Sequence, residues 1–211
     1  MPALDWRTVV VLIDFAGHPV LGSEYENELR YAALKSICFN NRFPPVVIVS
    51  DHIPTGEMTD NIAVNPREEE IKKLVEVEGR HVWLSIDPDE QPTVEDIKSM
   101  IIQKGYRPRN IILGGTNTVG CVLKNKNYSL LKWAEYGYDT TLFLPMCNDY
   151  QLPGRTWAER VMTAWSIVSD RLDRIGPLAQ KIDIKNSVED LKMYRPNSAR
   201  IEQAEYNRSY K

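Results

Sequence analysis

Cysteine is scarce in this chain, and its three residues form no pattern. Cys38, Cys121 and Cys147 are widely spaced, odd in number and outside any Cys-x-x-Cys pair. A disulfide framework and a zinc ribbon both need paired or clustered cysteines, so the sequence excludes both. At least one thiol is therefore free.

The chain also lacks an excess of either charge. It has 26 Lys and Arg residues against 29 Asp and Glu residues, a formal net charge of -3 at pH 7, and no block of like charge dominates. Nucleic-acid-binding domains and proteins that bind anionic membranes carry basic patches, so neither kind of partner is expected.

Long hydrophobic runs are absent as well. The longest, residues 8–13 and 45–49, are far too short to cross a bilayer, and residues 1–7 hold no signal-peptide core. We therefore expect a cytoplasmic protein. No internal repeat or low-complexity segment is present, which excludes a solenoid or a fibrous protein.

What remains is an ordinary globular composition. With 211 residues, 43% of them hydrophobic and 26% charged, the chain is long enough for one sizeable core and too short for two full domains. We expect a domain over residues 1–180 and a C-terminal extension or arm over residues 181–211. The extension is either a loose terminus or an arm that packs on a neighbouring subunit. The side chains available for such packing are Leu191, Met193, Tyr194 and Tyr206.

Short apolar runs alternate with stretches of helical spacing. Strands are predicted over 9–13, 46–50, 81–86, 110–113 and 140–144, and helices over 23–39, 66–78, 93–104, 121–136 and 157–175. Apolar strands joined by helical crossovers form parallel sheets that are covered on both faces. We therefore predict an α/β fold, a three-layer sandwich around a parallel sheet of five or six strands.

In such sheets, ligands bind beyond the carboxyl ends of the strands. The residues that follow the predicted strands are Asp14, Asp51, His52, Asp87 and the loops 114–121 and 145–149. Cys147, in the last of these loops, is expected to line the same site. Cys38 lies on the apolar stripe of its predicted helix and is expected in the core.

Residues 111–122 carry the densest signal, a strand that runs through a glycine-rich turn into a helix. Cys121 lies at the predicted start of this helix, where unpaired backbone amides lower the pKa of a thiol and favour the nucleophilic thiolate. The same amides can stabilise an oxyanion. A phosphate or nucleotide site is a second interpretation of such a turn, but it lacks the Lys-Ser/Thr of a P-loop and the spacing of a dinucleotide fingerprint.

These residues resemble the isochorismatase-like cysteine hydrolases, which include nicotinamidases and N-carbamoylsarcosine amidase-type enzymes. The family motif Gly-x-x-Thr-x-x-Cys-Val is present from Gly115 to Val122, and a Gly-Tyr pair follows at Gly137 and Tyr138. The segment Val-Val-Leu-Ile-Asp-Phe at 10–15 resembles the family's first strand, which ends in a catalytic aspartate. The order of elements agrees over most of the chain.

The resemblance implies a role for each matching residue. Cys121 is the implied nucleophile, and Asp14 is the carboxylate that takes its proton. The amides of Asn117 and Cys121 form the implied oxyanion hole, with a cis peptide bond before Asn117. The further candidates for binding the oxyanion or a small-molecule substrate are Thr116, Gly120, Asp87 and His52, and no cofactor is expected.

The chain departs from the family at one catalytic position. Family members place a lysine shortly after the third strand, whereas residues 83–92 contain none. Lys72, Lys73 and Lys98 are the nearest lysines, and each is expected to be a solvated surface charge. Without a cation, a thiolate and a carboxylate in contact raise each other's pKa.

Asp51 and His52 are similar to the Asp-x-His of metal-binding nicotinamidases, but the spacing is one residue short and no partner histidine follows within the next turn or loop. A single histidine makes a poor metal site. We therefore interpret His52 as a structural or substrate-contacting residue and expect no metal.

Two functions fit the sequence. The first is a cysteine hydrolase that acts on a small amide, carbamoyl or enol-ether substrate through Cys121 and Asp14. The second is a catalytically inactive isochorismatase-like protein that binds a small ligand or a protein partner. A homo-oligomer is expected in either case, and the missing lysine keeps both functions open.

Overall fold

The computed structural model describes residues 7–13, 15, 24–40, 43–50, 66–77, 79, 81–85, 92–116, 118–148, 159, 163, 166–167, 170, 181–185, 187 and 191. The elements follow in the order β1 (Thr8–Ile13), α1 (Glu24–Cys38), β2 (Val46–Ser50), α2 (Pro66–Val77), β3 (Val82–Ser85), α3 (Val94–Gln103), β4 (Asn110–Thr116), the π-helix η1 (Thr118–Asn125), α4 (Leu130–Glu135), β5 (Asp139–Asn148) and β6 (Ile182–Lys185).

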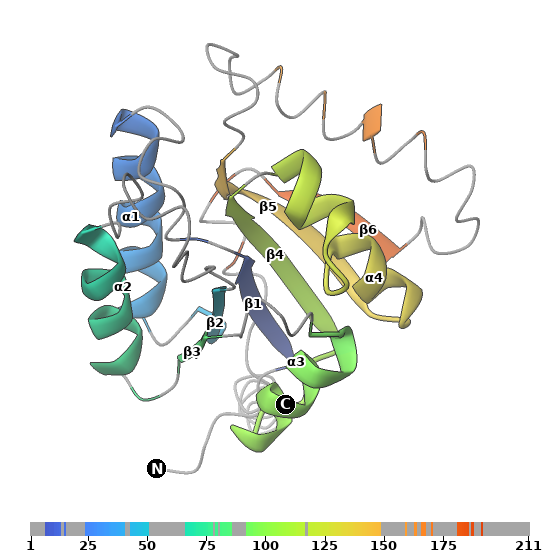
Figure 1. Ribbon diagram of the computed structural model, residues 1–211, viewed down its shortest axis with the longest axis horizontal. Helices are drawn as coiled ribbons and strands as arrows, with labels where there is room; N and C mark the ends of the chain where they lie inside the picture. The colour runs from blue at the N-terminus through green and yellow to red at the C-terminus, as the bar shows by residue number, and fades with distance from the viewer. Residues whose placement is uncertain are drawn as a thin grey trace, which may run out of the picture.

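The described strands form one six-stranded sheet in the order β3-β2-β1-β4-β5-β6, and every neighbouring pair is parallel. Figure 1 shows α1 and α2 on one side of the sheet and α3 and α4 on the other. The predicted three-layer α/β fold is thus confirmed. Because β2 and β4 lie on opposite sides of β1, the strand order reverses direction at the boundary between β1 and β4.

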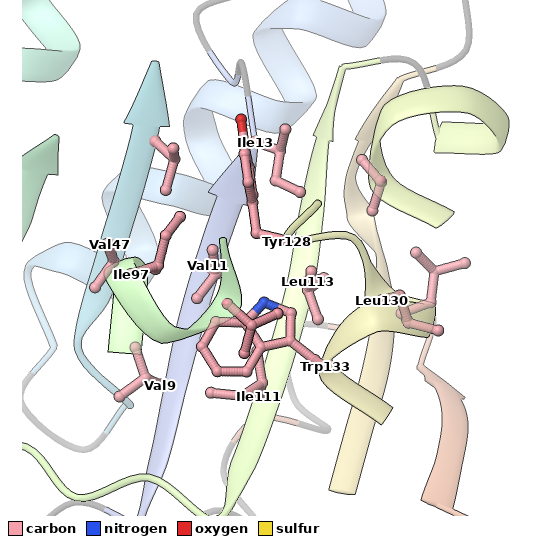
Figure 2. Close-up of a cluster of buried hydrophobic side chains, with 14 of the residues drawn as sticks. Val9, Val11, Ile13, Val47, Ile97, Ile111, Leu113, Tyr128, Leu130 and Trp133 are labelled. Carbon is pink, nitrogen blue, oxygen red and sulfur yellow. The ribbon is translucent and has the colours of Figure 1, made fainter. Parts of the chain in front are cut away.

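The sheet separates two buried clusters. The first cluster lies between the sheet and α3, η1 and α4, and Figure 2 shows Trp133 and Tyr128 in its centre. The second cluster lies between the sheet and α1 and α2. Successive side chains of β1 alternate between the two, with Val11 and Ile13 in the first and Leu12 in the second. All six residues of β1 are therefore buried, as expected for a central parallel strand.

The predicted ends of α1, α2 and α3 agree with the structure to within one residue. The N-terminus of α3 shows why, because Thr93 and Asp96 form a capping box that satisfies otherwise unpaired backbone amides. At the other end, Gly105 adopts a φ of 87°, which a glycine accepts without strain.

The single helix predicted over 121–136 is wrong. The structure has two helices there, η1 and α4, separated by a turn over residues 126–129. Asn125 and Asn127 have low helix propensity, and Ser129 takes the extended N-cap conformation that begins α4. Because η1 begins at Thr118, Cys121 is the fourth residue of its helix and not the first.

The sequence analysis does not predict β6, which lies in the stretch assigned to the C-terminal extension. β6 pairs with β5 from Thr140↔Ile182 to Phe143↔Lys185 and completes one edge of the sheet. Leu191 is fully buried in the second cluster of its own chain, so it is not available to a neighbouring subunit. Met193, Tyr194 and Tyr206 lie outside the described residues.

Within the predicted helix over 157–175, the described residues 159, 163, 166, 167 and 170 are all helical. Among the described helices, none has the length and apolar character needed to cross a membrane.

Candidate active site

The carboxyl ends of β1 and β4 lie side by side where the strand order reverses. Ile13, the last residue of β1, is the register partner of Gly115 in β4. In the sequence, Asp14 follows Ile13 and Thr116 follows Gly115. Ligands of open parallel sheets bind at this kind of switch point, outside the carboxyl ends of the strands. The two sequence motifs that resemble a catalytic site therefore leave the sheet at neighbouring positions.

Gly115 allows β4 to approach β1 more closely than a side chain would permit. Its φ is 138°, and a Cβ atom built on it would overlap the carbonyl oxygen of Ile13. A Cβ atom on Gly114 would lie 2.6 Å from the Cβ of Met146 in β5. Gly114 and Gly115 belong to β4 and not to the turn predicted over 114–121, and they allow β1, β4 and β5 to pack closely at this end.

Cys121 lies in η1, which begins two residues after the end of β4. Its side chain is partly exposed and packs against the first cluster, whereas Gly120 and Val122 beside it are buried. A π-helix bonds residues five apart, so Cys121 belongs to the first turn of η1. The structure thus places a partly exposed thiol in the first turn of the helix that follows β4.

The loop predicted over 145–149 is wrong up to Asn148, because β5 continues to that residue. Cys147 therefore lies inside β5, as the register partner of Gly115. An irregularity in β5 after Leu142 brings its side chain to the first cluster, the same face of the sheet as Cys121. The Cys147 thiol is buried and donates a hydrogen bond to the carbonyl oxygen of Phe143, at 3.3 Å. Cys38 is buried in the second cluster, on the opposite face, as expected for a core residue.

The structure places some of the predicted site residues and not others. Gly120 and Cys121 share η1, and Thr116 is the last residue of β4, opposite Asn148 of β5. The other predicted residues, which are Asp14, His52, Asp87 and Asn117, lie outside the described residues, and so does the peptide bond before Asn117. Their roles remain predictions.

Lys98 lies away from the site, although it is one of the lysines nearest in sequence to the position where the family has its catalytic lysine. Its ammonium contacts Glu95 at 2.9 Å, and this hydrogen bond raises the pKa of Lys98. Lys98 also faces Tyr138. Burial raises the pKa of Tyr138, and the positive charge of Lys98 lowers it. Tyr138 immediately precedes β5, so this cluster lies at the amino end of the strands, opposite Cys121. Lys72 and Lys73 belong to α2, on the other face of the sheet.

Sequence reasoning missed Arg30, which is buried at the carboxyl end of β1. It is 6% exposed, donates a hydrogen bond from Nη2 to the carbonyl oxygen of Phe15 at 3.1 Å, and lies 4.6 Å from the centre of the Phe15 ring. The sequence contains a pattern that indicates this burial, because Arg30, Leu34 and Ile37 recur at helical spacing. In the structure all three are buried. The same segment also offers the fully apolar spacing of Leu29, Ala33 and Ile37, which draws attention away from Arg30.

No group of three or more possible metal-ligating side chains occurs within the described part of the chain.

Solved structures of hydrolases share this fold. The nicotinamidase SaPncA from Staphylococcus aureus matches with a TM-score of 0.53 and 5% identity, over 86% of this chain and 98% of that chain. A cysteine hydrolase from Pseudomonas syringae pv. phaseolicola matches with a TM-score of 0.52 and 13% identity, over 91% and 96% of the two chains. The MAR1 ribonuclease from Caenorhabditis elegans matches with a TM-score of 0.52 and 12% identity, over 92% and 84%. No family model and no curated protein matches the chain.

At these identities the likeness establishes the fold alone. The fold is that of the isochorismatase-like cysteine hydrolases, in agreement with the motif around Cys121. Because one of the similar structures is a ribonuclease, the fold by itself does not select the reaction.

Proposed function

We propose that this protein is a cysteine hydrolase that acts on a small amide, carbamoyl or enol-ether substrate. The observation that carries the proposal is the position of Cys121, a partly exposed thiol in the first turn of η1. This turn follows β4 at the point where the strand order reverses. Ligands of parallel sheets bind at this point, so a nucleophilic thiol in this turn would face the substrate.

On an amide substrate, the Cys121 Sγ bonds to the carbonyl carbon and the carbonyl electron pair moves to the oxygen. The amides of Asn117 and Cys121 stabilise that oxyanion. Collapse breaks the C–N bond, and the leaving amine takes the proton that Asp14 received from the thiol. A water molecule that gives its proton to Asp14 then hydrolyses the thioester, which releases the acid and restores the thiol.

Four further residues complete the proposed site. Thr116 and Gly120 border the oxyanion hole, and His52 and Asp87, which follow β2 and β3 in the sequence, contact the substrate. The proposal includes no metal or cofactor. It places the protein in the cytoplasm as a homo-oligomer.

The test is the rate of iodoacetamide alkylation at each cysteine, resolved by peptide mass spectrometry from pH 5 to 9. A Cys121→Ser variant assigns the signal, and Cys147, a buried thiol in the adjacent strand, is the internal comparison. We expect the Cys121 rate to titrate well below the ordinary thiol pKa of about 8.5. In parallel, small primary amides that include nicotinamide are screened for release of ammonia by wild type and Cys121→Ser.

Rapid alkylation of Cys121 at neutral pH with Cys121-dependent ammonia release supports the hydrolase. An ordinary titration of Cys121 without turnover contradicts it and favours a catalytically inactive binding protein. Because one similar structure is a ribonuclease, single-stranded RNA is incubated with the same two proteins. RNA cleavage that persists in the Cys121→Ser variant would also contradict the proposed cysteine hydrolase.

A further inference from the structure

Four exposed cations gather where β1 and β4 begin, at the end of the sheet opposite the candidate active site. This basic patch consists of Arg7, Lys104, Arg107 and Arg109. Lys104 is the C-cap of α3, and the two arginines after it lie in the loop before β4. Arg7 precedes β1, and its carbonyl oxygen accepts hydrogen bonds from the amides of Arg109 and Asn110 at 2.7 and 3.0 Å. The pairing of β1 with β4 therefore joins cations that are far apart in the sequence.

The alternation of side chains along the strands decides which charges share a face of the sheet. Ile111 packs in the first cluster, so Arg109, two residues earlier, lies on the same face, which α3 covers. Asp139 of β5 is the register partner of Asn110 and is exposed. Since Asn110 follows Arg109 directly, Asp139 lies on the opposite face. This neighbouring carboxylate therefore does not neutralise the basic patch.

The charges of the basic patch also have no partner elsewhere in the part of the chain that the structure describes. Within it, none of the four side chains takes part in an ion pair or a hydrogen bond. The C-terminus of α3 carries about half a negative elementary charge, which is too little to offset four cations. The opposite charge must come from counterions or from a bound partner.

We propose that the basic patch binds the phosphate backbone of a nucleic acid. This inference goes beyond the proposed hydrolase and does not depend on it. Three of the four cations are arginines, whose planar guanidinium groups bind phosphate through two parallel hydrogen bonds. Ile102, in the last turn of α3, adds one exposed apolar side chain to the four charges. Nucleic-acid interfaces are much more positively charged than protein–protein interfaces, so this balance favours a nucleic acid over an acidic protein.

The sequence analysis expects no nucleic-acid partner, because no block of like charge occurs along the chain. The basic patch escapes that criterion, since Arg7 and Arg109 come together only through the register of two strands. Contacts with phosphates position a nucleic acid but do not read its bases. We therefore expect weak binding without base preference, with a Kd of about 10⁻⁶ to 10⁻⁴ M at physiological salt.

The test is fluorescence anisotropy with a labelled single-stranded oligouridylate and a labelled DNA duplex, which offer the same phosphate chemistry. For a single strand, the logarithm of the binding constant falls with the logarithm of the salt concentration by about 0.7 per phosphate contact. Four contacts thus predict a slope of about −3. Labelled poly-L-glutamate represents an acidic protein segment.

Paired substitutions locate the binding surface. Arg107→Gln with Arg109→Gln removes two charges of the patch and should weaken binding roughly tenfold or more, with a slope of about −1.5. Lys35→Gln with Lys73→Gln is the matched control, because both lysines are exposed on helices of the opposite face, and it should change neither value. Cys121→Ser should bind like wild type, since Cys121 lies at the other end of the strands. Circular dichroism and urea unfolding show whether each variant folds.

The outcomes that overturn the inference are distinct. Failure of both nucleic acids to bind at about 50 mM salt is one. Equal weakening in the two double variants is another, because net charge and not the patch would then govern binding. Tighter binding of poly-L-glutamate than of either nucleic acid would identify an acidic protein partner instead. Loss of binding in Cys121→Ser would move the nucleic acid to the candidate active site.

A second pair of substitutions keeps the test decisive if the first does not fold. Arg7→Gln with Lys104→Gln removes the other two charges of the patch and should weaken binding to a similar extent. Binding that is unchanged in this pair overturns the inference. None of these measurements depends on hydrolysis, so their failure leaves the proposed function to its own test at Cys121.

Discussion

His81 is buried at the amino end of β3 with both ring nitrogens engaged. Its Nδ1 accepts a hydrogen bond from the Val46 amide at 3.0 Å, so the ring proton is on Nε2, which lies 3.2 Å from the carbonyl oxygen of Cys38. One imidazole therefore links the end of α1 to the start of β2. A histidine that sequence reasoning leaves without a role is a structural bridge.

Replacement of His81 by leucine should lower the free energy of unfolding by about 2 to 4 kcal/mol, because it removes a hydrogen bond from a buried amide and another from a buried carbonyl. Urea unfolding followed by circular dichroism measures the loss. His81→Gln, whose amide can both accept and donate, should lose less. A His81→Leu variant as stable as wild type would show that neither hydrogen bond matters.

Gly115 gives a second prediction for a single residue. Gly115→Ala should cost about 3 kcal/mol or more, because the new Cβ would overlap the Ile13 carbonyl and force β1 and β4 apart. Gly79→Ala is the matched control, since Gly79 also has a positive φ, of 65°, but open space around its Cβ position. It should cost about 1 kcal/mol. Equal losses in urea unfolding would mean that backbone strain, and not the contact with β1, explains Gly115.

The helix caps lead to a prediction about whole elements. In the capping box of α3, the Asp96 carboxylate accepts hydrogen bonds from the Thr93 amide and hydroxyl at 2.8 and 2.7 Å. Thr93→Ala should lower stability by about 1 kcal/mol. Ser129→Ala, at the N-cap of α4, should change little, because the Ser129 hydroxyl makes no capping hydrogen bond and is buried with no hydrogen-bond partner among the described residues. Urea unfolding of both variants compares the two caps.

The same box makes stability depend on pH. The hydrogen bond from the Thr93 amide holds the pKa of Asp96 below its ordinary value. The contribution of Asp96 is therefore fully present above the unfolded pKa of about 4 and is lost as the pH falls through the lower folded pKa. Wild type should be more stable than Asp96→Asn at pH 7, and the gap should close toward pH 2 to 3. A gap that is unchanged between these pH values would exclude this linkage.

Most elements are predictable where the local pattern and the tertiary environment agree. The five predicted strands are apolar because a parallel sheet buries both faces, so composition alone marks them. The strand β6 fails this criterion, because it is a four-residue edge strand in which Asp183 is exposed. The break between η1 and α4 depends on Asn125 and Asn127, which weaken a helix by amounts that a longer apolar stripe conceals.

At the scale of the whole molecule, the sequence predicts the position of the site more reliably than its contents. The order of strands and helices brings the end of β1 next to the turn before Cys121, and the register of Ile13 with Gly115 confirms this. The helical spacing of Arg30, Leu34 and Ile37 could have indicated that Arg30 is buried, but its contact with Phe15 depends on how α1 packs across the sheet, and no local motif shows that.

The proposed homo-oligomer is a property of the whole molecule. Several large apolar side chains are exposed at the C-terminal ends of helices, among them Phe39 at 62% and Tyr136 at 49%. Single exposed side chains of this kind also occur on monomers, so they serve to test the proposed homo-oligomer and do not establish it. We expect size-exclusion chromatography at two concentrations to show an oligomer, and Tyr136→Lys to weaken it. A monomer at micromolar concentration would remove this part of the proposal.

The domain boundary proposed at residue 180 makes the last prediction. β6 covers the edge of β5 through four register pairs, and Leu191 fills a fully buried place in the second cluster. A chain cut after residue 180 should therefore expose the backbone donors and acceptors of β5 and leave a cavity. The loss of Leu191 alone should cost about 2 to 5 kcal/mol, by comparison with other buried leucines.

A chain cut after residue 195 is the control, because it keeps both β6 and Leu191. We expect urea unfolding to show nearly wild-type stability for this longer chain, and lower stability with self-association for the shorter one, since an uncovered edge strand pairs with other chains. If the two truncated chains are equally stable, residues 181–211 are a dispensable extension and the boundary at 180 holds. If only the shorter one fails, the folded unit extends at least to Leu191, and the sixth strand is as much a part of the domain as the five that precede it.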